Sequence, residues 1–340
     1  MDMAVVENKQ VIFRDYIDKE RVPRETDMEI RIGEIKLKAP KGSGLFLVKN
    51  LYLSCDPYMR GLMTKFQGSP HPPFVPGKVI QVFGVAKVVD SDNPNVKPGD
   101  MISGFTGWEE YSLIKRPEQL TKIEPDDEIP LSYHVGLLGM PGFTAYVLVS
   151  AAAGAVGQLV GQLAKLHGCY VVGSAGSNEK VDVLRNKLSF DEAFNYKEEP
   201  DLYAALKKCF PQGIDIYFDN VGGAMLDAVL LNMRVHGRIA VRGMVSFHSY
   251  DDHEGIHNLF NLTPRRITMR GFLQSDYLHL YPQFQEHIVA NYKQGKISYL
   301  EAVSEGLESG PAAFVGLVSG NNFGKQVVRV ALNDSPLLGL

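Results

Sequence analysis

The sequence predicts an α/β protein in which a β-rich region precedes a doubly wound parallel sheet. In the first third of the chain, apolar and polar residues alternate between turns rich in glycine and proline, which is typical of short, half-buried strands. From residue 147, strand patterns alternate with helical ones, and this order forms a parallel sheet that binds ligands at the carboxyl ends of its strands. The 340 residues are enough for two domains of ordinary size.

The clearest strand of the β-rich region begins at Met28. Met28, Ile30 and Ile32 alternate with polar residues, so we expect a strand with one buried face. Further short strands, separated by glycine and proline turns, are expected over residues 79–89, 101–103 and 325–330. Together they predict a small, partly closed β domain that the last strand completes.

The later region begins with a strand at residues 147–149 and a helix at 156–166. Val156, Leu159 and Leu163 lie on one face of that helix, with the spacing of an amphipathic segment. The other expected helices cover residues 180–187, 201–210, 225–233, 282–292 and 311–319. The other expected strands of this sheet cover residues 170–172, 193–196, 214–218, 239–241 and 268–272.

A turn of small residues joins the first strand and helix of this region, with the pattern Ala151-x-x-Gly154-x-x-Gly157. Small residues let the backbone approach a phosphate, and the helix N-terminus presents N–H groups to the anion. Ala155 and Val156 lie in the same turn. The pattern predicts the pyrophosphate site of a nicotinamide dinucleotide, although an ordinary tight strand-to-helix connection would have the same sequence.

The next strand should end near the cofactor's adenosine ribose, and residues 173–177 there read Gly-Ser-Ala-Gly-Ser. An enzyme for NAD places a carboxylate at this point, whereas small residues leave room for a 2′-phosphate that Lys180 can neutralise. Glu179 opposes this interpretation. The alternative is that Ser177 only caps a helix and Lys180 is a solvated charge. We predict NADP(H) as the cofactor.

Two further segments follow predicted strands, at residues 219–223 and 243–246. Their glycines would let the backbone approach the nicotinamide half of a dinucleotide. The alternative for Gly222-Gly223 is an ordinary entry turn of a helix.

Composition argues against several kinds of partner. A net charge of −4 offers no basic field to nucleic acid or an anionic membrane, and no apolar run reaches membrane-spanning length. The first 16 residues are polar and mixed in charge, without the apolar core of a signal peptide, so we expect a cytoplasmic protein. Three distant cysteines and nine scattered histidines predict neither a disulfide framework nor a metal site.

Five motifs carry a family resemblance: Asn-Leu-Tyr-Leu-Ser-Cys-Asp-Pro-Tyr-Met-Arg at 50–60, Gly-Met-Pro-Gly at 139–142, and the segments 151–157, 218–223 and 324–328. The chain resembles the zinc-independent medium-chain dehydrogenase/reductases, and most closely the plant NADPH-dependent 2-alkenal (double-bond) reductases, kin to prostaglandin/leukotriene reductases. The resemblance implies a GroES-like domain at 1–130, completed by 298–340, and a Rossmann domain at 131–297. It also implies a homodimer that reduces the C=C bond of α,β-unsaturated aldehydes and ketones.

The same resemblance assigns site residues. Lys180 and Tyr196 would bind the 2′-phosphate. The other implied cofactor contacts are Asn220, Gly243, Met244, Ser246, Phe272, Leu273, Gln274 and Asn322. A hydride passing from nicotinamide C4 to the substrate β-carbon leaves negative charge on the carbonyl oxygen, which needs a hydrogen-bond donor. The candidate catalytic donors are Tyr52, placed in the substrate pocket by the resemblance, His248 and Tyr250; a plain core position is the alternative for Tyr52.

Several departures from the family pattern leave alternatives open. Phe83 stands where relatives have a tyrosine, and Arg242 replaces a small cysteine, at a strand end where an unpaired buried charge is costly. After Tyr146 the relatives' helix end and turn are missing, which shortens the junction before the strand at 147–149. The alternatives are a zinc-free quinone reductase and an NADP-binding variant with impaired catalysis.

Overall fold

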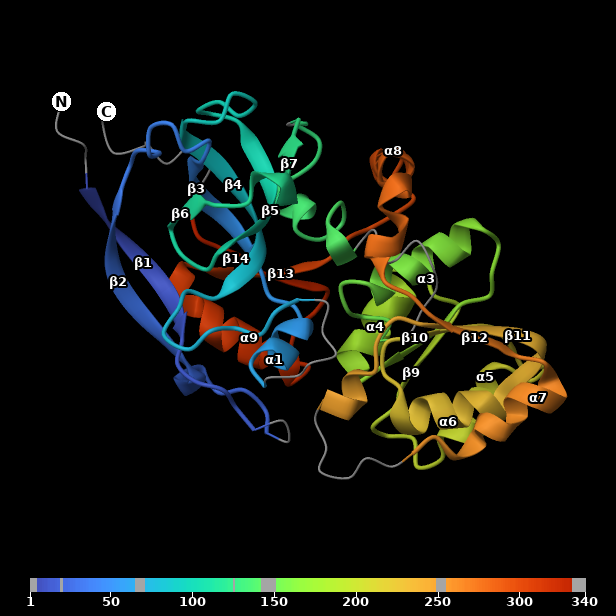
Figure 1. Ribbon diagram of the computed structural model, residues 1–340. Helices are drawn as coiled ribbons and strands as arrows, with labels where there is room; N and C mark the ends of the chain where they lie inside the picture. Colours follow the sequence, from blue (N-terminus) through green and yellow to red (C-terminus); the bar gives the residue numbers. More distant parts are fainter. Residues whose placement is uncertain are drawn as a thin grey trace. The chain divides into compact units, whose positions relative to one another are not determined.

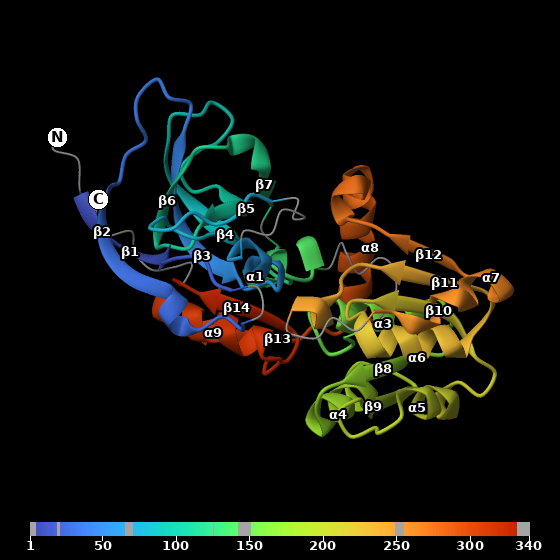
Figure 2. The same cartoon turned by 60° about the horizontal axis from the view of Figure 1, so that its bottom comes forward.

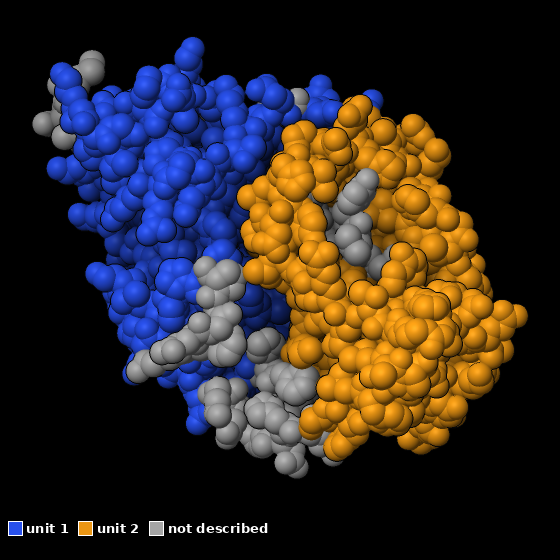
Figure 3. Space-filling model, turned by 45° about the vertical axis from the view of Figure 1, so that its right-hand side comes forward, with its two compact units in different colours: residues 1–136, 302–322, 326–340 blue, residues 137–301, 323–325 orange. Residues whose placement is uncertain are grey.

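The computed structural model describes residues 5–18, 21–64, 71–124, 126–141, 151–248 and 255–331. The chain forms two compact units, which Figure 3 shows in separate colours. Unit 1 comprises Met1–Gly136, Ala302–Asn322 and Gln326–Leu340, and unit 2 comprises Leu137–Glu301 and Phe323–Lys325. The expected limits, 1–130 with 298–340 against 131–297, differ from these at 131–136, 298–301 and 323–325.

Two glutamines of unit 2 explain the difference at 298–301. Helix α3 (Gly157–Leu166) carries Gln158 and Gln162, both buried. The Gln158 amide donates to the Leu300 carbonyl at 3.0 Å and accepts from the Leu300 N–H at 2.8 Å. Gln162 makes the same pair of bonds with Ser298, at 2.9 and 2.7 Å. Residues 298–300 are therefore hydrogen-bonded to α3 and belong to unit 2, up to the start of β13 at Glu301.

Unit 1 is built on a sheet of seven described strands (Figures 1 and 2). Their spatial order is β13 (Glu301–Glu305), β14 (Lys325–Arg329), β3 (Phe46–Ser54), β4 (Gln81–Ser91), β5 (Met101–Gly107) and β7 (Leu120–Ile123), with β6 (Tyr111–Ile114) paired to β3. The pairs from β14 to β7 are antiparallel. The last described strand, β14, thus joins the β-rich region.

A separate ribbon pairs β1 (Val5–Phe13) antiparallel with β2 (Met28–Lys36). The strand expected from Met28 is confirmed, but its expected buried face is wrong, because Ile30 is 39% and Ile32 64% exposed. Only the end of the ribbon around Phe13 and Met28 packs into the main core of unit 1. Alternation predicts the strand, but it does not reveal how far the core extends along it.

Helices α1 (Tyr58–Leu62) and α9 (Gly310–Val318) complete the core of unit 1, with Met59, Phe314 and Trp108 fully buried. The short 3₁₀ helices of this unit are η1 (Glu25–Asp27), η2 (Pro117–Gln119), η3 (Leu131–His134) and η7 (Leu307–Ser309).

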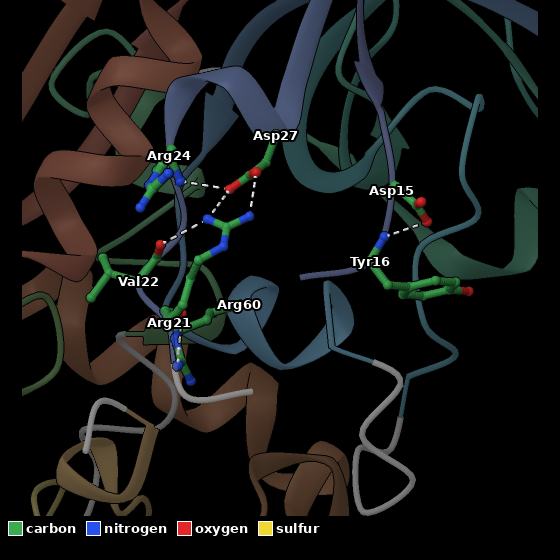
Figure 4. Close-up of polar contacts among 7 residues, drawn as sticks. All are labelled: Asp15, Tyr16, Arg21, Val22, Arg24, Asp27 and Arg60. Carbon is green, nitrogen blue, oxygen red and sulfur yellow. Dashed lines mark hydrogen bonds and ion pairs between the residues drawn. The ribbon is translucent and has the colours of Figure 1, made fainter. Parts of the chain in front are cut away.

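Figure 4 shows how the segment before β2 is fixed. The Arg21 guanidinium donates to both Asp27 carboxylate oxygens, at 2.8 and 2.5 Å, and the Arg24 N–H donates to the same carboxylate at 2.7 Å. Arg60 of α1 donates to the Arg21 carbonyl at 3.0 Å. This segment is thereby tied to the motif at residues 50–60.

Unit 2 confirms the predicted alternation of parallel strands and helices. Strand β8 (Val172–Ala175) pairs parallel with β9 (Glu192–Asn195). The other described strands of the unit form a parallel sheet in the order β10 (Ile214–Asp219), β11 (Met233–Val241), β12 (Thr268–Gly271). The fold class is therefore the predicted one, a β-rich region followed by a Rossmann-like parallel sheet.

The helices of unit 2 that are described over their full length include, besides α3, α4 (Asn178–Asn186), α5 (Leu202–Cys209), α6 (Gly223–Asn232), α7 (Leu262–Arg265) and α8 (Tyr281–Lys293), with 3₁₀ helices η4 (Val245–His248), η5 (His257–Asn261) and η6 (Gln274–Leu280). The expected strand at 147–149 and the junction after Tyr146 lie outside the described residues. In the part of the chain that is described, no helix is both long and apolar enough to cross a membrane.

One strand lies later than expected. The strand predicted over residues 170–172 is found at Val172–Ala175, while Tyr170 is 55% exposed. Gly173 lies inside this strand. A Cβ there would lie 2.8 Å from the Ala152 Cβ and 3.0 Å from the Phe190 ring, so the tight packing at this position requires glycine. Small residues therefore allow close packing of β8, and its carboxyl end falls at Gly176 rather than at residue 173.

Candidate functional site

The turn at 151–157 brings its backbone against the start of α3. A Cβ on Gly157 would lie 2.2 Å from the Ala151 carbonyl oxygen, so only glycine fits there. Ala151 has a φ of 51°, in the left-handed region. Ala155 and Val156 are half-buried just before the first turn of α3. The turn thus meets a helix N-terminus, whose N–H groups can face an anion.

Gly324 closes this turn from the far end of the sequence. It forms a parallel bridge with Gly154, and its N–H donates to the Ala153 carbonyl at 2.9 Å. Its φ is 64°, and a Cβ would lie 2.0 Å from the Leu300 carbonyl oxygen. The segment returning from Leu300 therefore requires glycine at 324, and this explains one motif of the resemblance in structural terms.

The carboxyl end of β8 carries the predicted cation. Lys180 is half-buried, and its Nζ lies 5.6 Å from the centroid of the Phe323 ring. Burial lowers the pKa of the Lys180 ammonium, and the positive charge of Lys197 lowers it further. Lys180 is therefore not an ordinary solvated charge. From the sequence, no role was predicted for Phe323 or Lys197.

The neighbouring side chains have separate tasks. The Ser177 Oγ accepts from the Lys180 N–H at 3.4 Å and caps α4, as the alternative interpretation held. Hydrogen bonding to the Ser177 hydroxyl lowers the pKa of the exposed Glu179 carboxyl, so this carboxylate is engaged at the helix N-terminus. Tyr196 follows β9, and its hydroxyl lies 3.2 Å from where a Cβ on Gly176 would be.

The loops after β10, β11 and β12 hold one another by backbone hydrogen bonds. The Val245 N–H donates to the Asn220 carbonyl at 3.0 Å, and the Phe272 N–H donates to Val241 at 3.3 Å. A Cβ on Gly243 would lie 3.4 Å from the Asn220 carbonyl oxygen. These bonds gather one set of predicted cofactor residues at one edge of the sheet: Asn220, Gly243, Met244, Ser246, Phe272, Leu273 and Gln274.

Asp219, at the end of β10, shapes the first of these loops. Its buried Oδ1 accepts from the N–H groups of Val221 and Gly222, at 2.9 and 2.8 Å, and from the Tyr217 hydroxyl at 3.2 Å. Burial raises the pKa of the Asp219 carboxyl, and these three bonds oppose the rise. Gly222 and Gly223 both have positive φ, at 70° and 52°. The sequence pointed to this loop, but not to Asp219 as the residue that orients it.

Arg242 lies between the second and third loops. It is half-buried, and its guanidinium donates to the Gln274 Oε1 at 3.4 Å. Because Arg242 is partly exposed and makes this bond, the free-energy cost of placing its charge at a strand end is reduced. Arg242 thereby ties Gln274 to the end of β11.

The predicted catalytic donors are spread over different parts of the chain. Tyr52 lies half-buried on β3 of unit 1, opposite Arg329 of β14. Hydrogen bonding to Glu305 raises the pKa of Arg329, and the Tyr52 hydroxyl contributes to that rise. The side chain of His248 and all of Tyr250 lie outside the described residues.

Asn322 and Phe83 also belong to unit 1. Asn322 is half-buried and directly precedes Phe323 of unit 2. Phe83 packs edge-on to Phe105, with ring centroids 5.9 Å apart. Within the described ranges, no group of three His, Cys, Asp or Glu side chains is placed to hold a metal ion.

Comparisons with known proteins cover nearly the whole chain. Residues 16–123 match a family described as the N-terminal domain of oxidoreductase, and residues 155–290 match one described as zinc-binding dehydrogenase. The chain is 58% identical over 340 residues to an NADP(+)-dependent 2-alkenal reductase of Nicotiana tabacum, covering 96% of this chain and 98% of that protein. It is 52% identical over 343 residues to a (+)-pulegone reductase of Mentha piperita, covering 96% and 99%.

Solved structures agree with these relatives. The NADPH complex of CurA from Vibrio vulnificus has a TM-score of 0.87 at 34% identity, covering 95% of this chain and 99% of that one. A quinone oxidoreductase of Escherichia coli complexed with NADPH has a TM-score of 0.73 at 17% identity, covering 94% and 99%, and shows the fold alone.

Proposed function

This chain belongs to the medium-chain dehydrogenase/reductase superfamily, in the group of the NADP-dependent 2-alkenal reductases, and we propose that it uses NADPH to reduce the C=C bond of α,β-unsaturated aldehydes and ketones. The observation that carries the proposal is the identity of 58% and 52% with two reductases, a 2-alkenal reductase and a pulegone reductase, over 96% of the chain in each case. The geometry of unit 2 supports the choice of cofactor.

The residues of unit 2 fit NADPH in three places. The close approach at Gly157 leaves the N-terminus of α3 for the pyrophosphate. Residues 173–177 carry no carboxylate, and Lys180 stands beside them for the 2′-phosphate. The linked loops at Asn220, Gly243 and Phe272 offer backbone groups to the nicotinamide half. When bound, NADPH supplies the hydride that reaches the substrate β-carbon.

The protein's own chemical task is to stabilise the negative charge that develops on the substrate carbonyl oxygen. A hydrogen-bond donor aimed at that oxygen does this. We assign the donor to Tyr52, with His248 and Tyr250 as the alternatives. Support for Tyr52 comes from its position on a rigid strand, beside an Arg329 guanidinium that is itself held by Glu305 at 2.7 Å.

The reaction class can be tested with purified protein, NADPH and a panel of 2-alkenals, enones and quinones, followed by cofactor absorbance. We expect NADPH oxidation with the alkenals and enones, and a saturated carbonyl compound as product. Turnover of quinones without turnover of alkenals would favour the zinc-free quinone reductase. NADPH binding without any turnover would favour the impaired variant, for which the junction after Tyr146 is the candidate cause.

Tyr52→Phe tests the donor. Loss of one oxyanion donor should lower kcat by roughly 10²-fold or less, because the cofactor ribose hydroxyl also donates. The Kd for NADPH should not change. Tyr203→Phe is a matched control, since Tyr203 is 43% exposed on α5. An unchanged kcat for Tyr52→Phe would move the role to His248 or Tyr250.

We also propose that the protein is a homodimer of the cytoplasm. Strand β12 ends the order β10-β11-β12 among the described strands, and most of its residues are exposed. An open strand edge of this kind can pair with a second copy. The described cysteines are all free thiols, which suits a reducing compartment.

A proline at the β12 edge tests the dimer. Because the Phe272 N–H donates to Val241 of β11, alternation turns the Met269 N–H away from β11. Met269→Pro removes that N–H and should yield a monomer in analytical ultracentrifugation, whereas Met269→Ala should stay dimeric. A monomeric wild-type protein would refute the proposal, and microscopy of a tagged chain tests the compartment.

A further inference from the structure

The carboxyl ends of β8 and β9 leave the sheet side by side. The last pair of their parallel register is Ala175 with Asn195, and the Tyr196 N–H donates to the Ala175 carbonyl at 3.0 Å. Beyond that pair, the Lys197 Cε lies 3.3 Å from where a Cβ on Gly176 would be. The side chain of Lys197 therefore passes over Gly176, at the strand end where the ribose phosphate is expected.

Two cations thus share one strand edge. Lys180 is half-buried against the Phe323 ring, and the charge of Lys197 is close enough to destabilise the Lys180 ammonium. The backbone of Lys197 is fixed, since its N–H donates to the Asn195 Oδ1 at 3.2 Å. Two like charges held together repel each other, and a bound anion between them relieves that repulsion.

Two acidic side chains near the lysines are engaged by neutral groups. Glu198 accepts from the Asn178 Nδ2 at 2.8 Å, and Glu179 is engaged by the Ser177 hydroxyl. Glu179 and Glu198 both keep their negative charge. Lys180 alone would therefore leave this edge net negative, and Lys197 brings it back to about neutral before a phosphate binds.

We propose that Lys197 is a second cation for the 2′-phosphate of NADPH, and that with Lys180 it determines the preference for NADPH over NADH. The inference rests on the proposed NADPH-dependent function and names a residue that the family resemblance did not assign. A phosphate monoester carries between one and two negative charges near neutral pH, which two ammonium groups match better than one. The NADH ribose carries only a hydroxyl there, so Lys197 gives it little advantage.

The test compares Lys197→Ala, Lys197→Arg and the control Lys187→Ala, which removes an exposed lysine at the far end of α4. The measured quantities are the Kd values for NADPH, NADH, adenosine 2′,5′-bisphosphate and 5′-AMP, without substrate. Lys197→Ala should weaken binding of the two 2′-phosphate ligands roughly 5- to 20-fold, less than the loss of the half-buried Lys180, because the Lys197 side chain is exposed and water screens its contact. Binding of NADH and 5′-AMP should change less than about twofold. Arginine at 197 should restore most of the NADPH affinity, because it keeps the charge.

Three outcomes would overturn the inference. They are equal losses for NADPH and NADH, a loss no larger than that of Lys187→Ala, and no recovery with arginine. Turnover separates this result from the proposed function: at saturating NADPH, Lys197→Ala should keep the wild-type kcat for an alkenal and show only a raised KM for NADPH. Absence of alkenal turnover in the wild type would refute the proposed function while leaving the binding comparison valid.

Discussion

The two units contain different kinds of polar cluster. In unit 1 the fully buried side-chain amide of Asn50 is hydrogen-bonded to the polar groups around it, whereas in unit 2 two lysines of like charge lie at one strand edge. Asn50 donates to the carbonyls of Gly107 and Glu109 and to the Ser112 hydroxyl, at 3.2, 2.7 and 3.0 Å, and accepts from Thr106 at 3.0 Å. Lys180 and Lys197 meet at the end of β8 and β9 with their charges in mutual repulsion.

The difference teaches which polar groups indicate a ligand. The buried polar groups around Asn8 and Asn50 are paired with one another, and they fix β1, β3 and β6 in register. Such a network specifies a fold and leaves nothing for a partner to bind. Backbone strain follows the same division, since all four described non-glycine residues with positive φ, Ala151, Ser189, His236 and Arg266, lie in unit 2.

The largest expected effect is the loss of Asn50. Asn50→Ala leaves Thr106, Ser112 and two carbonyls without their buried partner, and should lower the free energy of unfolding by about 3–4 kcal/mol. Urea denaturation measures this, with the exposed Asn95→Ala as control, expected within about 0.5 kcal/mol of wild type. The folded fraction should bind NADPH as wild type does. A small loss of stability, or a selective loss of NADPH affinity, would break the comparison between the units.

The second prediction is the converse, in unit 2. Lys180→Ala should weaken NADPH roughly 10- to 150-fold, equivalent to about 1.5–3 kcal/mol for a charge-assisted contact, while NADH changes little. The melting temperature should change little, because loss of the Phe323 contact and relief of the repulsion from Lys197 oppose each other. Fluorescence titration with both cofactors measures the effect. Equal losses for NADPH and NADH would show that Lys180 supports the turn rather than the phosphate.

The third prediction uses Glu109, a carboxyl inside the network of unit 1. Burial raises its pKa above the ordinary value of 4.5, although Gln10, Ser112 and Asn8 donate to it at 2.6, 2.8 and 3.0 Å. As pH rises from that ordinary value through the raised one, the unfolded chain loses the proton first, so folding stability falls. The loss is complete once the pH exceeds the raised pKa.

Glu109→Gln removes that pH dependence, because glutamine keeps an oxygen for Asn8 and Gln10 and has no proton to lose. The variant should be more stable than wild type above the raised pKa and equal to it near pH 4, because only the wild type must ionise the buried carboxyl. Thermal melting across pH 4–7 measures the difference, with the exposed Glu118→Gln as control. A destabilised variant at pH 7 would mean that the charged form is the one that the network requires.

The sequence predicted unit 2 better than unit 1, and β1 shows why. The segment Val-Val-Glu-Asn-Lys-Gln-Val-Ile-Phe looks polar and was not predicted as a strand. In the structure Asn8 and Gln10 face the carboxylate of Glu109, about a hundred residues away, rather than solvent. Polar residues that point into a buried network look like surface residues, so periodicity alone misses them. Several strands of unit 2 contain short apolar runs, such as Ile-Tyr-Phe in β10 and Ile-Ala-Val in β11, and most were located within a few residues.

The same distinction holds at the site. Glycine spacing predicted the turn at 151–157, because the close approach at Gly157 is a local requirement. Lys197 and Phe323 gave no local signal. Lys197 reaches Gly176 through the parallel register of β8 and β9, and Phe323 reaches Lys180 because the chain returns through Ser298 and Leu300, held by two glutamines of α3. Contacts of this kind follow from tertiary structure, which spacing in the sequence does not encode.

The smallest expected effect concerns the strained backbone of the turn. Ala151 adopts a φ of 51°, which costs an L-residue roughly 1–2 kcal/mol, whereas glycine adopts it freely. Glycine also gains about 0.4–1 kcal/mol of entropy in the unfolded chain, so Ala151→Gly should stabilise the protein by only about 0.5 kcal/mol. The control is Ala153→Gly, at a buried neighbour without positive φ, which should destabilise. Melting curves compare the two, with NADPH affinity recorded alongside. If both variants lose stability equally, the left-handed position stores no strain, and the turn would be as relaxed as the network of unit 1.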